Sequence, residues 1–122
     1  MRIFKNKMFY KWTASQGISD LMLAKAAGEI VQGLVDGHLG GSLVKKRVPR
    51  KGQGKRGGFR TIVVFQKGYR TFFVYGFPKN ERANINQQEE KALKKLAENL
   101  LDAPDSRLRE MISNGDLYEV MT

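Results

Sequence analysis

Two apolar segments in the middle of the chain constrain its fold more than any other feature. Residues 59–65 and 70–77 alternate as β-strands do, yet large apolar side chains occupy both odd and even positions of each segment. Only residues 66–69 lie between them, which predicts an antiparallel hairpin. Because a hairpin that is apolar on both sides must be covered on both sides, helices are expected to pack against each of its faces.

Strand alternation assigns each side chain of this hairpin to one face. The first segment is expected to carry Phe59, Thr61, Val63 and Phe65 on one face and Arg60, Ile62 and Val64 on the other. The second segment is expected to carry Phe72 and Val74 opposite Phe73, Tyr75 and Phe77. The strand therefore fixes the direction of Arg60.

Helical patterns precede the hairpin. Ser19 is expected to cap a helix with apolar residues at three-to-four spacing, namely Leu23, Ala26, Ala27, Ile30 and Leu34. A shorter helical turn is expected at residues 8–12. Three glycines, Gly37, Gly40 and Gly41, are expected to end this helical half. Residues 43–48 then form a third strand, and their charged side chains predict an exposed edge.

Two more helices are expected after the hairpin. Asn86 and Glu89 form a capping box, and an apolar stripe follows at Leu93, Leu96, Ala97 and Leu100. A last helix begins near Pro104, and residues 117–121 add a short strand or docked tail. The 122 residues therefore describe a small single α+β domain, with N-terminal helices packed on a short antiparallel sheet and with C-terminal helices.

The positive charge of the chain is concentrated in its middle third. The net charge is +10, and residues 45–82 hold twelve Lys and Arg but a single acidic residue, Glu81. Residues 45–60 alone carry eight basic residues, no acidic one and four glycines. Such a positive field attracts polyanions, of which nucleic acid is the commonest in the cytoplasm. An acidic protein partner would be attracted by the same field, and a basic loop that is simply solvated is the third interpretation.

The composition of the chain excludes several kinds of catalytic and metal site, and it argues against a membrane-spanning segment. The chain has no cysteine and one histidine, His38, which excludes disulfides, thiolate zinc, a cysteine nucleophile and a pair of histidines. No cofactor is expected. The apolar runs are far shorter than the roughly 20 residues that span a bilayer, so no membrane association and a cytoplasmic location are expected.

The remaining residue types suit RNA cleavage without a metal. The 2′-hydroxyl must lose a proton and attack the adjacent phosphorus, cations must stabilise the growing negative charge, and the leaving 5′-oxygen must gain a proton. Arg60 is the strongest candidate for phosphate contact. Lys55 and Arg56 on the basic loop, and Lys79 and Arg82 after the hairpin, are further catalytic candidates. General contacts with the RNA backbone are expected from Lys46, Arg47, Arg50 and Lys51.

Two motifs resemble one known family. They are V-K-K-R-V at residues 44–48, continuing to K-G-Q-G-K-R-G-G-F-R at 51–60, and Y-G-F-P-K-N-E-R at 75–82. Together they resemble the RelE toxins of bacterial type II toxin–antitoxin pairs, within the wider RelE/ParE superfamily. The resemblance covers about residues 1–101. Residues 102–122 extend beyond it and are expected to form a C-terminal helix and tail that pack on or extend the same domain.

The resemblance implies a ribosome-dependent messenger-RNA endonuclease that inhibits translation and is silenced by a cognate antitoxin. By position, Arg60 resembles the strand arginine that contacts the scissile phosphate. Lys55 and Arg56 resemble the family's loop cations, and Lys79 with Arg82 resembles its second basic cluster. No residue is assigned as the general acid.

Two other functions remain open at this point. ParE toxins share the general architecture and inhibit DNA gyrase without catalysis. A basic RNA-binding domain without toxicity is the third possibility, and it would bind RNA with a steep salt dependence while leaving it uncut.

Overall fold

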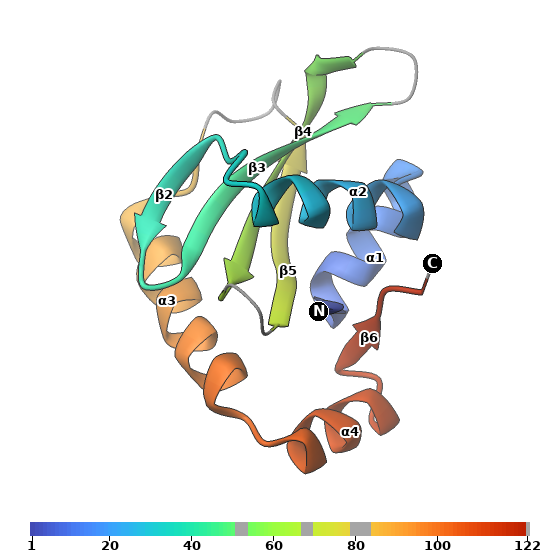
Figure 1. Cartoon of the computed structure of the whole chain (residues 1–122), viewed down its shortest axis with the longest axis vertical. Coiled ribbons are helices and arrows are strands. Elements are labelled where there is room, and N and C mark those ends of the chain that lie inside the picture. Colours follow the sequence, from blue (N-terminus) through green and yellow to red (C-terminus); the bar gives the residue numbers. More distant parts are fainter. Residues whose placement is uncertain (51–53, 67–69, 79–83, 122) are drawn as a thin grey trace.

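A computed structural model describes residues 1–50, 54–66, 70–78 and 84–121 of the chain (Figure 1). The described residues form β1 (Arg2–Asn6), α1 (Lys7–Gln16), α2 (Asp20–Val31), β2 (Gly37–Gly40), β3 (Leu43–Arg50), β4 (Gly54–Phe65), β5 (Arg70–Pro78), α3 (Gln87–Asp102), α4 (Asp105–Ser113) and β6 (Leu117–Glu119). None of these helices is long and apolar enough to cross a membrane.

All six strands belong to one sheet, in the order β2-β3-β4-β5-β1-β6. Every neighbouring pair is antiparallel except β1 and β5, which run parallel. The small α+β domain with a mainly antiparallel sheet is therefore confirmed. So is the central hairpin, which β4 and β5 form.

The sheet separates two apolar clusters, as a hairpin that is apolar on both faces requires. The first cluster joins α1 and α2 to one face, and its buried members include Phe9, Leu23, Ile30, Val63 and Phe73. The second joins α3 and α4 to the other face, and its buried members include Phe4, Ile62, Phe72, Leu100 and Leu108. Figure 1 shows α2 on one side of the sheet, with α3 running along the side of β2 and β3.

The helix signals in the sequence were largely correct. The side chain of Ser19 caps α2, and Asn86 with Glu89 forms the complete capping box at the start of α3. On α3, Nζ of Lys94 lies 3.2 Å from Oε2 of Glu90, an ion pair between residues one helical turn apart. Leu34 is an exception, because α2 ends at Val31 and the Leu34 side chain is 53% exposed.

Three predictions about strands were wrong. β1 and β2 were not predicted, and β2 occupies the stretch from Gly37 to Gly40 that was expected to be a turn. β3 lies between β2 and β4 and is therefore not an edge strand. Its charged residues are tolerated inside the sheet because Lys46 forms an ion pair with Glu29 and because the side chain of Arg47 is partly exposed.

Tyr75 and Phe77 lie on the face opposite to the predicted one. A β-bulge in the hairpin pairs Ile62 with Tyr75 but Val63 with Phe73. The extra residue, Val74, reverses the alternation beyond it. Tyr75 therefore packs against the α3 cluster, and Phe77 pairs with Arg60 on that same side.

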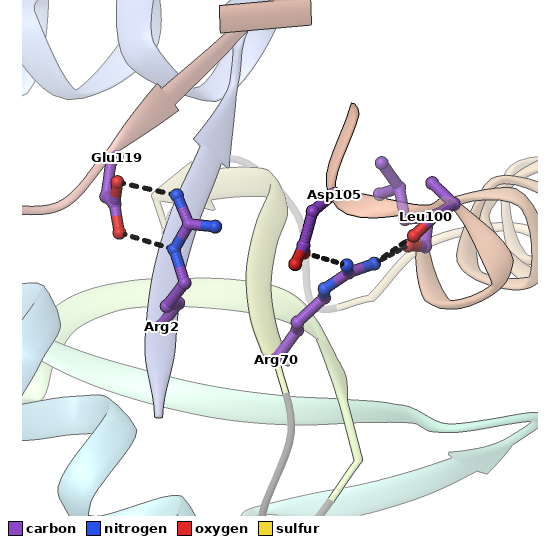
Figure 2. A network of polar contacts seen from close by, with 6 residues as sticks. Arg2, Arg70, Leu100, Asp105 and Glu119 are labelled. Atoms are coloured by element: carbon purple, nitrogen blue, oxygen red, sulfur yellow. Dashed lines mark hydrogen bonds and ion pairs between the residues drawn. The ribbon is translucent and has the colours of Figure 1, made fainter. Parts of the chain in front are cut away.

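Two arginines fasten the C-terminal segment to the sheet (Figure 2). Arg70, at the start of β5, donates hydrogen bonds to the carbonyl oxygens of Leu100 and Ala103 and, at 2.7 Å, to Asp105. It thereby satisfies carbonyls at the end of α3 and holds the first turn of α4. Arg2 of β1 makes two 2.9 Å hydrogen bonds to Glu119 of β6. Leu108 and Leu117 are fully buried in the second cluster, so this segment shares the core of the domain.

Gly76 is expected to be intolerant of any side chain. A Cβ at this position would lie 2.2 Å from the indole of Trp12, which packs on Phe9 and Phe59. Gly76→Ala should therefore destabilise the protein by about 1–3 kcal/mol, through overpacking. Each kcal/mol corresponds to a fall of about 3–6 °C in Tm, measured by thermal unfolding.

Gly28→Ala is the matched control for that substitution. Gly28 lies within α2, and nothing is within 4 Å of its added Cβ. Replacing a helical glycine with alanine should raise the stability by about 0.5–1 kcal/mol. Equal effects at the two positions would contradict the packing described for Trp12.

The ion pair between Arg2 and Glu119 should make stability depend on pH. The hydrogen bonds from Arg2 lower the pKa of Glu119 below its ordinary value of 4.5. The carboxylate therefore stabilises the fold above that value, and the contribution disappears as the pH falls through the lower folded pKa. Because both side chains are partly exposed, Glu119→Gln should cost less than about 1 kcal/mol at pH 7. The Tm difference from wild type should shrink between pH 5 and pH 3, and a constant difference would exclude this linkage.

Candidate nucleic-acid interface

Two arginines face each other across the pairing of β3 and β4. Arg47 is the direct register partner of Arg60, and Arg60 is in turn the partner of Phe77 on β5. Lys45 precedes Arg47 by two residues and therefore shares its face. We call Lys45, Arg47, Arg60, Tyr75 and Phe77 the arginine face. It lies on the side of the sheet that carries α3.

The guanidinium groups of this face have buried donors that the described part of the chain leaves unsatisfied. The Nε atoms of Arg47 and Arg60 are both buried, and no described residue accepts a hydrogen bond from either. A buried donor without an acceptor costs about 1–3 kcal/mol, and like charges directly opposite in a sheet repel each other. The pair therefore favours an anion with several acceptor oxygens, such as a phosphate group.

Aromatic side chains form the β5 side of the arginine face. Phe77 is buried, Tyr75 is half-buried, and their ring centroids lie 6.0 Å apart. Tyr75 packs against the α3 cluster, so its ring contributes to the core as well as to the face. Tyr75 is the register partner of Ile62, two residues from Arg60 on β4, and its side chain is partly exposed.

A glycine brings β3 and β4 close together just before the arginine pair. A Cβ on Gly58 would lie 2.2 Å from the carbonyl oxygen of Val48, so only glycine fits this backbone approach. The register of the two strands shifts between Val48 and Arg50, at the neighbouring Pro49. Gly58 thus fixes the approach of the strands two residues before Arg60.

Lys46 points away from the arginine face and into the fold. Its side chain is only 3% exposed, with Nζ 2.9 Å from the carboxylate of Glu29 and 2.7 Å from the carbonyl oxygen of Leu34. It thereby fastens the C-terminal end of α2 to β3. Because this position gives Lys46 a structural role, we leave it out of the proposed RNA-binding surface.

The structure does not describe the side chains of the other predicted site residues. Lys51, Lys79 and Arg82 lie outside the described residues. The backbones of Lys55 and Arg56 are part of β4, and that of Arg50 ends β3, but their side chains are not described. β5 ends at Pro78, directly before Lys79, in register with Phe59.

Lys45 of the arginine face, and Asp36, which contacts that face, were not among the predicted site residues. Lys45 was considered only as a sign of an edge strand, although its spacing of two from Arg47 was the available signal. Asp36 lies outside the basic segment and contacts Arg47 only through the pairing of β2 with β3, so no local signal identified it. Within the described residues, no group of three His, Asp or Glu side chains is placed to hold a metal ion.

A comparison with protein families agrees with this architecture. A family model described as the RelE toxin of the RelE/RelB toxin–antitoxin system matches residues 1–120. The match extends beyond residues 1–101, to which the resemblance was expected to apply, and includes α4 and β6. Nearly the whole chain is therefore accounted for by one family, and the protein belongs to the RelE toxins of toxin–antitoxin systems.

Proposed function

We propose that this toxin is a ribosome-dependent messenger-RNA endonuclease whose phosphate-binding centre is the arginine face. The observation that carries the proposal is the pair of buried Nε donors on Arg47 and Arg60, which no described residue satisfies. A phosphodiester offers two non-bridging oxygens, which matches two adjacent guanidinium groups. Membership of the RelE family supports the same reaction class, since these toxins are generally endoribonucleases.

The reaction proposed is an internal transfer at phosphorus. The 2′-oxygen gives up its proton to a base and forms a new bond to phosphorus, while the bond from phosphorus to the 5′-oxygen breaks. The leaving 5′-oxygen gains a proton, so the products are a 2′,3′-cyclic phosphate and a 5′-hydroxyl. Arg60 and Arg47 stabilise the extra negative charge on the phosphoryl oxygens as the bonds exchange.

Further basic residues extend this centre. Lys45 lies on the same face, two register pairs from Arg47 and Arg60, and adds positive charge to it. We assign Lys55, Arg56, Lys79 and Arg82 to closing on the bound phosphate, and Arg50 and Lys51 to holding the flanking backbone. These assignments rest on their positions in the two family motifs.

The ribosome would supply what this small chain lacks. A cationic face can stabilise charge, but it cannot by itself fix the 2′-oxygen in line with the leaving oxygen. Holding messenger RNA in the decoding site supplies that orientation, an effect that can reach several kcal/mol. We therefore expect the toxin to cleave free RNA only weakly.

The antitoxin is proposed to act on the same charge. RelE toxins imply a RelB-type antitoxin partner. With a net charge of +10 on the toxin, an acidic antitoxin segment would relieve repulsion within the basic region and block RNA from it. A native complex without any acidic contact to residues 45–82 would contradict this part of the proposal.

Arg60→Ala should slow cleavage strongly while Arg109→Ala should not. Both substitutions remove one positive charge, but Arg109 is exposed on α4, which contacts β6, a strand that three others separate from β3. Removal of a charge-stabilising donor typically slows a reaction by about 100–1,000-fold. The measurement is mapping of new messenger-RNA 5′ ends in a cell-free translation reaction, with a reaction lacking ribosomes alongside.

Each outcome of this experiment has a distinct meaning. New ends within the decoding-site codon that require both ribosomes and Arg60 would support the proposal. A folded Arg60→Ala protein that cuts as wild type does would remove Arg60 from the centre. Uncut RNA from a growth-inhibiting wild-type protein would favour gyrase inhibition, whereas salt-dependent binding without cleavage or growth arrest would indicate a simple RNA-binding domain.

A further inference from the structure

Arg47 differs from Arg60 in having an acidic neighbour. Asp36, in the connection between α2 and β2, accepts a hydrogen bond from the backbone N–H of Arg47, with 2.7 Å between nitrogen and Oδ2. Its other oxygen, Oδ1, lies 3.8 Å from Nε of Arg47. One carboxylate therefore contacts both the backbone and the guanidinium of the same arginine.

The carboxylate of Asp36 is itself held in place. The backbone N–H of Asp36 donates to the carbonyl oxygen of Lys45 at 2.8 Å. Between these two contacts on β3, the Lys46 side chain is bonded to Leu34 and Glu29 on the opposite face. Three consecutive residues of β3 are thus fastened to the end of α2 and its following connection, which leaves Asp36 little freedom to move.

The distance from Oδ1 to Nε determines what this carboxylate can do. At 3.8 Å it is too long for a hydrogen bond, so Asp36 does not use up the Nε donor. Opposite charges at that distance still attract, and more strongly near a protein surface than in bulk water. Asp36 can therefore hold the guanidinium of Arg47 in place against repulsion from Arg60. The Nε donor of Arg47 stays available to a ligand.

We propose that Asp36 is a positioning residue, which holds Arg47 beside Arg60 so that both guanidiniums address one RNA phosphate. This inference rests on the proposed endonuclease function and deepens it. Asp36 touches neither RNA nor the reacting atoms, and it acts through Arg47. Its negative charge opposes RNA binding, so its contribution is to the rate of cleavage rather than to affinity.

A positioning role predicts slower cleavage with unchanged binding and stability, which a purely structural role of Asp36 would not produce. Asp36→Asn keeps an oxygen that accepts the Arg47 N–H but removes the charge beside Nε. We expect single-turnover cleavage on programmed ribosomes to slow by about 10-fold or more, because small errors of placement cost catalysis heavily. Binding of the variant to the same ribosomes should be as tight as wild type or tighter, and the Tm should change little.

Three further variants make the test specific. Asp102→Asn removes the same charge from an exposed position at the end of α3 and should cleave as wild type does. Arg47→Ala should slow cleavage, and the double variant with Asp36→Asn should be no slower than Arg47→Ala alone. Wild-type cleavage by Asp36→Asn, multiplying effects in the double variant, or weakened binding with a matching loss of Tm would each overturn the inference.

A measurement without RNA separates this inference from the proposed function. In the NMR spectrum of the isolated toxin, the Nε–Hε group of Arg47 should be more mobile in Asp36→Asn than in wild type or Asp102→Asn. Unchanged mobility would overturn the positioning role even if the wild type cleaves RNA. Absence of cleavage by wild type, together with the expected change in mobility, would instead remove the endonuclease proposal while Asp36 would still be shown to fix Arg47.

Discussion

The pairing of β4 with β5 buries apolar side chains on both faces, and the rest of the molecule is arranged to cover them. Helices α1 and α2 cover one face, and α3 and α4 cover the other. β1 and β6 extend the sheet on one side of this hairpin, and β3 and β2 extend it on the other. The arginine face is possible only because β3 is held against β4 in a fixed register, which places Arg47 opposite Arg60.

Four basic residues of the middle third whose side chains the structure describes form two groups with different physical roles. Lys46 and Arg70 are buried. Lys46 is bonded to one carbonyl oxygen and a carboxylate, and Arg70 to two carbonyl oxygens and a carboxylate, so their charges connect helices to the sheet. Arg47 and Arg60 instead keep buried Nε donors that no described residue satisfies. Net charge alone does not distinguish these groups, because the difference depends on which face of a strand each side chain occupies.

Local signals explain which parts of the fold were predictable from the sequence. The hairpin and α3 were predicted because alternation and a capping box act over a few residues. β1 was missed because its partner strand β5 is distant in sequence, and because a lysine is not expected in a buried strand. Lys5 is buried there because Asp20 of α2 pairs with its charge. Tyr75 was assigned to the wrong face because a bulge has no signature in simple alternation. The face that carries Arg60 could be predicted from its strand, whereas the contact of Asp36 with Arg47 depends on the pairing of β2 with β3.

The parallel strand β1 has a consequence for how this protein reaches its folded state. β1 lies between β5 and β6, and its Arg2 pairs with a glutamate 117 residues later. Contacts between such distant segments slow folding, because a large loop must be closed before they form. An N-terminal segment that has been synthesised without β5 has no parallel partner for β1, and without β6 the other edge of β1 stays open. Completion of the sheet is therefore a late event in folding. Because of this topology, the toxin reaches its folded state only after the last part of its chain has been synthesised.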